Sequence, residues 1–152
     1  MAKEIERKVL VNSRHPTFSK LMETNYSKIR QGNIMSSPTG VVRVRVEDGF
    51  ASLAIKGVTT GISRNEYEYE IPIPDAEQLL ADMCSKVIEK NRYLYPLRDG
   101  LVAEVDVFPQ IDLCIAEVEL PSEETEFEKP EWFTEEVSHD PQYFNNNIAK
   151  RI

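Results

Sequence analysis

The sequence predicts a mainly β (α+β) fold, in which one domain forms an eight-stranded antiparallel β-barrel tunnel with flanking helices. Segments that alternate between apolar and charged residues recur through most of the 152-residue chain. Two turn signals, Asp48-Gly49 and Asp99-Gly100, separate such segments as hairpin turns do. No linker, repeat or low-complexity tract interrupts the sequence, so we expect a single domain over residues 1–152.

The first half of the chain supplies five of the eight expected strands. Residues 4–11, EIERKVLV, alternate strictly and predict the first strand. A short helix is expected near residues 18–23, within a polar stretch. Four further strands are expected at residues 26–35, 41–48, 50–57 and 63–73. The third and fourth of these five strands flank Asp48-Gly49 and therefore form a hairpin.

The second half begins with a helix expected over residues 75–86, for which Asp75 is the candidate N-cap. Its apolar stripe consists of Leu79, Leu80 and Met83. Three strands are then expected at residues 87–97, 101–108 and 113–120. The tail, residues 122–152, is expected to form helix and loop that close one end of the barrel. Trp132 and Phe133 would fasten this tail to the barrel wall.

The composition excludes several classes of function. The formal net charge is -8, so the chain gains nothing from counterion release on nucleic acid and is repelled by anionic lipid. No apolar run is long enough to span a membrane, and the charged start shows no signal peptide. Cys84 and Cys114 lack metal-ligand spacing and are expected to be free thiols in a cytoplasmic protein. The sequence leaves open whether the chain acts as a monomer or a homodimer.

Nearly every expected strand carries full charges on one face and apolar side chains on the other. In residues 41–48, for example, Arg43 and Arg45 share one face and valines occupy the opposite face. The other charged rows contain Glu4, Glu6 and Lys8; Lys56; Glu66, Glu68 and Glu70; Lys90 and Arg92; Glu104 and Asp106; and Glu117 and Glu119. One interpretation is that these rows form the solvated outside of an ordinary barrel. However, carboxylates are poor strand formers, and like charges side by side cost energy unless opposite charges lie between them.

The interpretation we favour turns the barrel inside out, with the charged rows lining a tunnel and the apolar rows packed outward against the helices and tail. An eight-stranded barrel is just wide enough to hold one small ligand. The cationic side chains would suit a polyanion, because guanidinium groups bind phosphate oxygens in pairs. The carboxylates would suit Mg²⁺ or Mn²⁺. Together they describe a metal–polyphosphate site.

The EIERK stretch at residues 4–8 resembles the Glu-x-Glu-x-Lys signature of the CYTH domain family, the triphosphate tunnel metalloenzymes. Further blocks follow in family order: RQG, VRVR, IKG, SRNEYEYEI, EKNRY, EVDVF, AEVEL and PEWFTEEVSHDPQYFNNNIA. The signature alone arises easily by chance, but the ordered set covers nearly the whole chain. The sequence departs from the family at residues 109–114, where a glycine is common, and at Asn33, where an aromatic residue is common.

The resemblance implies an eight-stranded antiparallel tunnel and assigns roles by position. Its metal ligands would be Glu4, Glu6, Glu117 and Glu119, with Asp106 joining them directly or through water. Glu68, and less clearly Glu66, would support a second metal. The phosphate chain would be bound by Lys8, Arg43, Arg45, Lys56, Lys90 and Arg92. Glu6 and Lys8 are the catalytic candidates, and Lys8 would either orient the terminal phosphate or assist proton transfer from water.

The family's known activities act on triphosphates and include inorganic and thiamine triphosphatases, class IV adenylyl cyclase and fungal RNA 5′-triphosphatase. We expect hydrolysis of the terminal phosphoanhydride of inorganic tripolyphosphate with Mg²⁺ or Mn²⁺, because the EKNRY, AEVEL and PEWF blocks are most similar to those of bacterial tripolyphosphatases. An adenylyl cyclase, or a nucleoside or thiamine triphosphatase, is one alternative; a nucleotide enzyme would need a base-binding pocket. A polyphosphate-binding module without turnover is another, although every presumed metal carboxylate is present.

Overall fold

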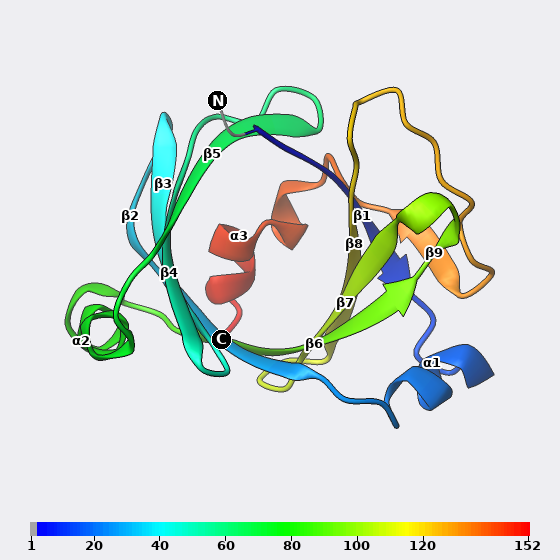
Figure 1. Ribbon diagram of the computed structural model, residues 1–152, viewed down its shortest axis with the longest axis horizontal. Coiled ribbons are helices and arrows are strands. Elements are labelled where there is room, and N and C mark those ends of the chain that lie inside the picture. The colour runs from blue at the N-terminus through cyan, green and yellow to red at the C-terminus, as the bar shows by residue number, and fades with distance from the viewer. Residues whose placement is uncertain (1–2) are drawn as a thin grey trace.

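The computed structural model describes residues 3–152 and shows a closed antiparallel barrel (Figure 1). Its strands are β1 (Lys3–Val11), β2 (Ser27–Ser37), β3 (Gly40–Glu47), β4 (Phe50–Lys56), β5 (Ser63–Glu70), β6 (Ile88–Pro96), β7 (Val102–Phe108), β8 (Leu113–Glu119) and β9 (Phe133–Glu136). Eight of them form the wall in the order β5-β4-β3-β2-β6-β7-β8-β1, and β1 closes the ring by pairing with β5. The predicted eight-stranded antiparallel barrel is therefore confirmed.

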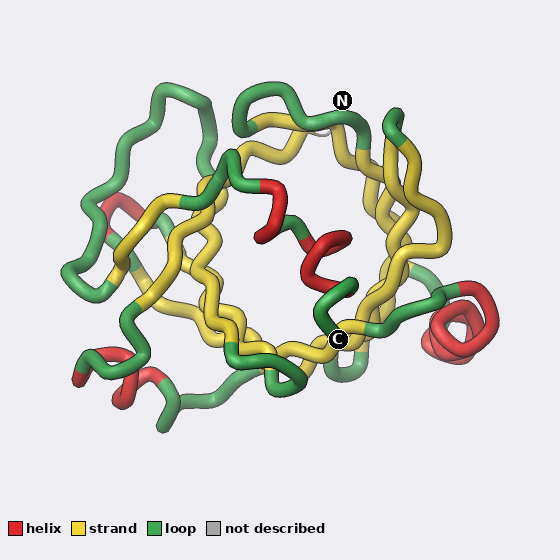
Figure 2. Tube along the Cα trace, turned by 180° about the vertical axis from the view of Figure 1, so that it is seen from behind, coloured by secondary structure: helices red, strands yellow, loops and turns green. Residues whose placement is uncertain are grey.

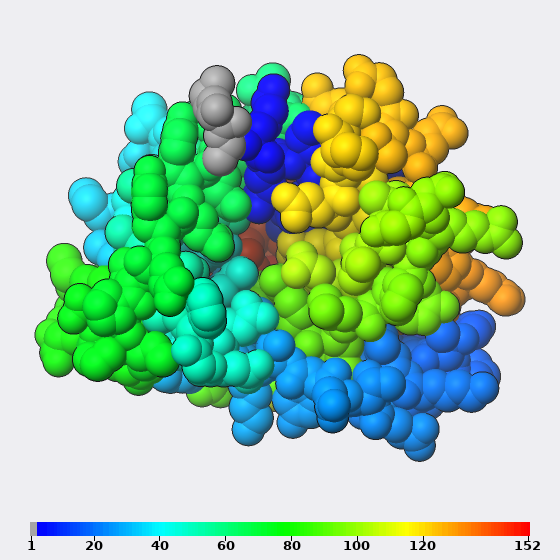
Figure 3. Space-filling view, viewed as in Figure 1, coloured from blue at the N-terminus to red at the C-terminus, as the bar shows by residue number. Residues whose placement is uncertain are grey.

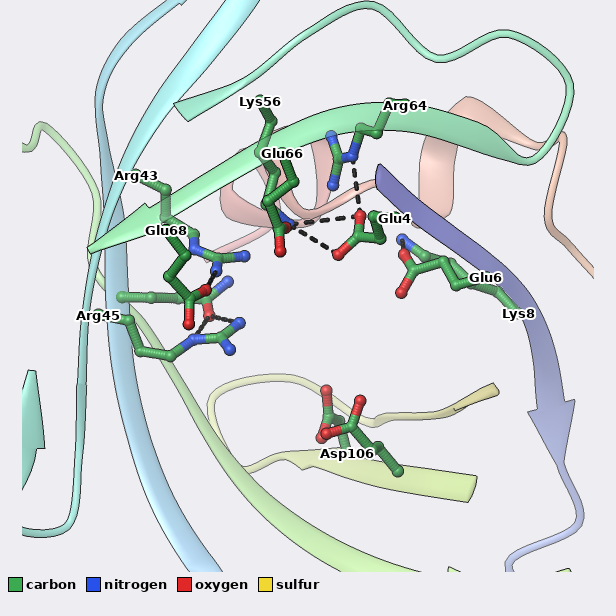
Figure 4. A network of polar contacts seen from close by, with 12 residues as sticks. Glu4, Glu6, Lys8, Arg43, Arg45, Lys56, Arg64, Glu66, Glu68 and Asp106 are labelled. Atoms are coloured by element: carbon green, nitrogen blue, oxygen red, sulfur yellow. Dashed lines mark hydrogen bonds and ion pairs between the residues drawn. The ribbon is translucent and has the colours of Figure 1, made fainter. Parts of the chain in front are cut away.

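The strand register places the charged rows on the inside of the ring. Across β1 and β8, Glu6 lies opposite Glu119 and Lys8 lies opposite Glu117. Charged side chains from β1, β3, β4, β5 and β7 project into one common space inside the wall (Figure 4). Because successive strand residues point to opposite faces, the apolar rows of the same strands must face outward. The inverted barrel expected from the sequence is confirmed.

The outward apolar rows are covered in two places, as a barrel with a polar interior requires. On one side Val105, Ala116 and Val118 pack with Trp132 and Phe133, which are 2% and 4% exposed. The short helix α1 (Pro16–Leu21) adds Leu21 to this cluster. On the other side, helix α2 (Ile73–Met83) buries Ala76 and Leu80 against the valines of β3. These two hydrophobic clusters therefore lie outside the barrel wall, and Trp132 and Phe133 fasten the tail as predicted.

The C-terminal segment turns back into the barrel and closes one end of it. Helix α3 (Asn145–Ala149) lies inside the ring of strands in both ribbon views (Figures 1 and 2). Ile148 is fully buried there against Ile88, Phe108 and Ile115. Those three residues occupy the same rows as the charged residues of β6, β7 and β8, so the inner face is not charged along its whole length. The expected closing tail is thus present, and it is held by an apolar floor.

Two local predictions differ from the structure. Helix α2 begins at Ile73 with Pro72 as its N-cap, so Asp75 lies in the first turn and caps nothing. The extended backbone of Pro72, followed by Pro74 at the helix start, sets this earlier boundary. Strand β9, which pairs with β1 through Val9 and Val11, was missed because the tail shows little alternation. In residues 3–152, no helix is long and apolar enough to cross a membrane.

Candidate active site

The charged rows meet around a cavity of about 280 Å³, which we call the charged cavity. Its wall consists of Glu4, Glu6, Arg43, Arg45, Glu47, Lys56, Arg64, Glu66, Glu68, Arg92, Glu104, Glu117, Glu119 and Asn145. Eight carboxylates and five cationic side chains share this wall, so carboxylates are in excess. The surface is hollowed at the centre of the face in Figure 3, where the red C-terminal segment is visible at depth.

A smaller cavity of about 90 Å³, the inner cavity, adjoins the charged cavity and shares six of its lining residues. Lys8 and Phe144 line the inner cavity together with Ser138 from the tail. The two cavities together reach from the carboxylates of β8 to the C-terminal segment. A ligand in the charged cavity would therefore extend toward the tail.

The wall formed by β1, β4 and β5 holds a dense group of ion pairs (Figure 4). The Lys56 ammonium lies 3.3 Å from Glu4 Oε2 and 2.8 Å from Glu66 Oε2, and Arg64 Nε donates to Glu4 Oε1 at 2.9 Å. Burial alone would raise the pKa of Glu4, but Lys56, a hydrogen bond with Glu66 and Arg64 lower it to about 2. Glu4 is therefore an anion whose charge is balanced by its neighbours.

Glu6, Glu117 and Glu119 form a second group, in which negative charges face one another. Burial, followed by the charges of Glu117 and Glu4, holds the pKa of Glu6 well above its usual value. Burial and then Glu4 and other carboxylates also raise the pKa of Glu119. Burial would do the same to Glu117, but Lys8, Lys90 and Arg92 hold its pKa well below the usual value. A cation placed among these groups would relieve the repulsion.

Two arginines from β3 form the facing wall. Arg43 is 6% exposed, and its Nη2 lies 3.7 Å from Glu68 Oε2. Burial and the neighbouring Arg45 lower the pKa of Arg43 to about 10, so it remains a cation at neutral pH. Arg45 donates to Gln31 Oε1 from Nε and Nη2 at 2.9 and 2.7 Å. Because a single neutral oxygen accepts both bonds, the charge of Arg45 is available to an anion.

Lys90 and Asp106 lie beneath the charged cavity and are fully buried. Arg92 donates to both Asp106 oxygens, from Nε at 2.8 Å and Nη2 at 2.9 Å, and Lys90 Nζ lies 2.9 Å from Oδ2. Burial would raise the pKa of Asp106, but Lys90 and Arg92 outweigh it and lower that pKa. Burial lowers the pKa of Lys90 to about 8 despite the Asp106 charge. Both carboxylate oxygens of Asp106 thus already have cationic partners.

Lys8 is placed by the tail as well as by its own strand. Ser138 Oγ accepts from the Lys8 backbone N–H at 2.9 Å, which ties β1 to the segment after β9. The Lys8 ammonium lies 5.4 Å from the centre of the Phe144 ring and 4.0 Å from Glu6 Oε1. The side chain is held at the inner cavity by a cation–π contact and by its neighbour on the same strand.

The donor set fits a hard divalent cation that shares its shell with a ligand. Among residues 3–152, no three His, Cys, Asp or Glu side chains converge closely enough to hold an ion alone. Mg²⁺ normally takes one or two carboxylates and completes its shell with phosphate oxygens and water. Glu6 and Glu119, whose pKa values are raised by burial and then by neighbouring carboxylates, could supply such ligands.

Most of the predicted site residues meet at the two cavities. Lys90 and Asp106 are the exceptions, because they reach neither cavity wall. Sequence reasoning missed Arg64, although it stands two residues before Glu66 in the same alternating row. It also left out Glu104, which accepts a hydrogen bond from Arg92 Nη1 at 3.0 Å. Extending the charged row of β5 by one step would have found Arg64, whereas Glu104 already stood in the row of Asp106 but was given no role.

The sequence matches a known protein family. A model described as the CYTH domain matches residues 2–152. The chain belongs to the CYTH family. An inorganic triphosphatase of Acetivibrio thermocellus is 44% identical over 153 residues, covering 99% of this chain and 95% of the relative. A second inorganic triphosphatase, from Nitrosomonas europaea, is 36% identical and covers 98% of both chains.

Two solved structures agree with the barrel. The crystal structure of the inorganic triphosphatase NE1496 matches with a TM-score of 0.67 at 31% identity, covering 100% of this chain and 97% of that chain. A putative adenylate cyclase from Bacillus halodurans matches with a TM-score of 0.61 at 18% identity, covering 82% and 84%. The second match shows that the fold is shared and carries no information on activity.

Proposed function

We propose that this CYTH protein hydrolyses inorganic tripolyphosphate to pyrophosphate and phosphate. The observation that carries this proposal is the charged cavity, whose wall is entirely ionisable except for Asn145. Its arginines and lysines suit phosphate oxygens, and its excess of carboxylates requires divalent cations before a polyanion can enter. Two relatives of 44% and 36% identity are inorganic triphosphatases, which supports the same substrate.

The cavity favours an inorganic triphosphate over a nucleotide. A nucleobase is usually bound by apolar or aromatic side chains, whereas the charged cavity is lined by neither. Phe144, which lines the inner cavity, already has Lys8 over its ring. These features oppose the cyclase and nucleoside triphosphatase alternatives.

In the proposed reaction, a water oxygen attacks the terminal phosphorus and the bridging P–O bond breaks. The bridging oxygen leaves with pyrophosphate, and the terminal group leaves as phosphate. Arg43, Arg45 and Lys56 hold the phosphate chain and offset its charge, so that water can approach in line. Lys8, at the inner cavity, orients the terminal phosphate.

Glu6, Glu117 and Glu119, with support from Glu68, would hold the cofactor, Mg²⁺ or Mn²⁺. When bound, such an ion neutralises phosphate charge and lowers the pKa of coordinated water. The protein's own contribution is to keep these carboxylates close together despite their repulsion. Burial, followed by the charges of Glu117 and Glu4, raises the pKa of Glu6 as a result of this arrangement.

A single chain supplies every side chain of the proposed site, so the reaction requires no second copy. We place the protein in the cytoplasm, because Cys84 and Cys114 are both free thiols and fit a reducing compartment. Neither thiol takes part in the proposed chemistry. Burial raises the pKa of both, to about 12 in Cys114, which keeps them protonated and unreactive.

One assay tests the function. The purified protein is incubated with Mg²⁺ or Mn²⁺ and, in parallel, with tripolyphosphate, ATP or thiamine triphosphate, with EDTA added to matched controls. We expect fast, metal-dependent phosphate release from tripolyphosphate and little from the organic triphosphates. Cyclic AMP and pyrophosphate from ATP would show a cyclase instead. Tight binding of tripolyphosphate without phosphate release would show a binding module.

A further inference from the structure

Three consecutive asparagines begin helix α3, and the structure uses them differently. Asn146 is held on both sides, since its Oδ1 accepts from Asn33 and its Nδ2 donates to Ser36 Oγ at 3.0 Å. Asn147 Nδ2 donates to the Pro141 carbonyl at 2.7 Å, inside the same segment. These two side chains therefore fasten α3 to β2 and to the residues that precede the helix.

Asn145 faces the cavities instead. It lines both the charged and the inner cavity, alongside Glu4, Glu6 and Arg43. Its Oδ1 is buried but has no hydrogen-bond partner among the described residues. Buried amide oxygens almost always have a partner, so this atom calls for an explanation. The charged cavity is where a missing partner would come from.

We propose that the Asn145 side-chain amide is a direct contact for the bound triphosphate. A half-turn of the amide exchanges Oδ1 and Nδ2, so the same position can present a donor to a phosphoryl oxygen. The donor would come from the C-terminal segment and reach a substrate otherwise held by strands. This inference rests on the proposed function, which gives Asn145 no role.

The rest of α3 explains how the segment can present this side chain. Ile148 packs on the apolar floor, and Lys86 Nζ donates to the Ile152 carbonyl oxygen at 3.0 Å. Asn146 and Asn147 add the bonds described above. The helix is thus anchored through several residues other than Asn145. Removing the Asn145 amide should leave the segment in place.

Three variants test the contact by steady-state kinetics with tripolyphosphate. Asn145→Ala removes the donor and should raise KM roughly tenfold, as expected for a hydrogen bond to a charged group. Asn145→Asp keeps the shape but places a carboxylate against phosphate, and should raise KM roughly a hundredfold. Asn147→Ala loosens the same helix without touching either cavity and should leave KM within about twofold.

The ranking of the three KM values tests the proposal. Asn145→Asp performing as well as the unmodified protein would overturn the proposal, because an oxygen would then suffice at this position. Equal losses in Asn145→Ala and Asn147→Ala would overturn it too, since helix anchoring would explain both. Calorimetric binding of tripolyphosphate with Mg²⁺ gives the same ranking without turnover. It therefore tests Asn145 even if the unmodified protein proves not to hydrolyse this compound.

Discussion

Two carboxylates inside the same barrel have opposite surroundings. Asp106 on β7 receives two hydrogen bonds from Arg92 and an ion pair from Lys90, so its negative charge is fully matched. Glu6 on β1 faces Glu117 and Glu4, with Lys8 only at 4.0 Å. Burial would raise the pKa of both, yet the pKa of Asp106 is lowered and that of Glu6 is raised.

The difference shows how the charged inner face of one barrel can serve two purposes. Where cations equal or outnumber carboxylates, each carboxylate is ion-paired and the group stabilises the fold. Where carboxylates face one another, the site stores repulsion that a bound cation can relieve. We therefore interpret the Asp106 region as a structural floor and the Glu6 region as the ligand-binding part of the site.

The largest expected effect tests the structural role of Asp106. Asp106→Asn removes the charge that matches Lys90 and Arg92, which leaves Lys90 without its ion-pair partner and Arg92 with Glu104 alone. Breaking a buried pair in this way costs roughly 3–5 kcal/mol of unfolding free energy. Urea denaturation followed by circular dichroism measures that loss.

The matched control is Glu104→Gln, because Glu104 also bonds Arg92 but is partly exposed, at 33% for its side chain. It should cost less than about 1 kcal/mol, as exposed pairs do. Equal destabilisation by the two substitutions would contradict the assignment of Asp106 as the structural carboxylate.

Glu6→Gln tests the other side of the comparison. Glutamine resembles the protonated acid that the raised pKa of Glu6 favours, so the unfolding midpoint should stay the same or rise. Hydrolysis of tripolyphosphate should fall by roughly 10²–10³-fold, because a ligand to the catalytic cation is lost. Phosphate release and thermal unfolding are measured on the same preparation.

Glu70→Gln is the control, since Glu70 stands on β5 but does not line the charged cavity. Its activity should match that of the unmodified protein. Full turnover by Glu6→Gln would remove Glu6 from the proposed cation ligands.

The sequence predicts the barrel because alternation is a local property that each strand carries for itself. The rows of β1, β3, β5 and β8 specify which residues share a face, and the excess of charge indicates that this face is inside. The apolar ends of the rows on β6, β7 and β8 were not recognised as a floor. Alternation turns Ile88, Phe108 and Ile115 inward, and Ile148 returns from the far end of the chain to cover them.

The sequence predicts most residues of the site but not which of these residues pair with one another. Alternation places Lys90, Arg92 and Asp106 on the inner face, yet it cannot show that they bind one another. That pairing depends on the stagger between β6 and β7, which sets Arg92 opposite Asp106. The Phe144 ring beside Lys8 likewise comes from a segment more than a hundred residues away.

Arg45→Ala tests the cationic wall with a smaller effect. Arg45 bonds only a neutral oxygen of Gln31 within the described contacts, so its charge is the one most open to substrate. KM for tripolyphosphate should rise roughly tenfold, with a lesser change in kcat, as for loss of a charge-assisted hydrogen bond. The comparison variant is Arg30→Ala, which breaks an outward pair with Glu77 and should leave KM unchanged. An unchanged KM in Arg45→Ala would count against its role.

The smallest expected effect concerns Mg²⁺ without substrate. An ion that binds the folded chain and relieves repulsion among Glu6, Glu117 and Glu119 should raise the thermal midpoint. At ten times the dissociation constant the rise should be about 3–6 °C for a chain of this size. Glu119→Gln, which removes a carboxylate whose pKa is raised by partial burial and then by Glu4, should reduce this rise. Sodium chloride at equal ionic strength separates specific binding from screening. A rise of the same size in NaCl would mean that the carboxylates of β1 and β8 merely repel one another and bind no ion.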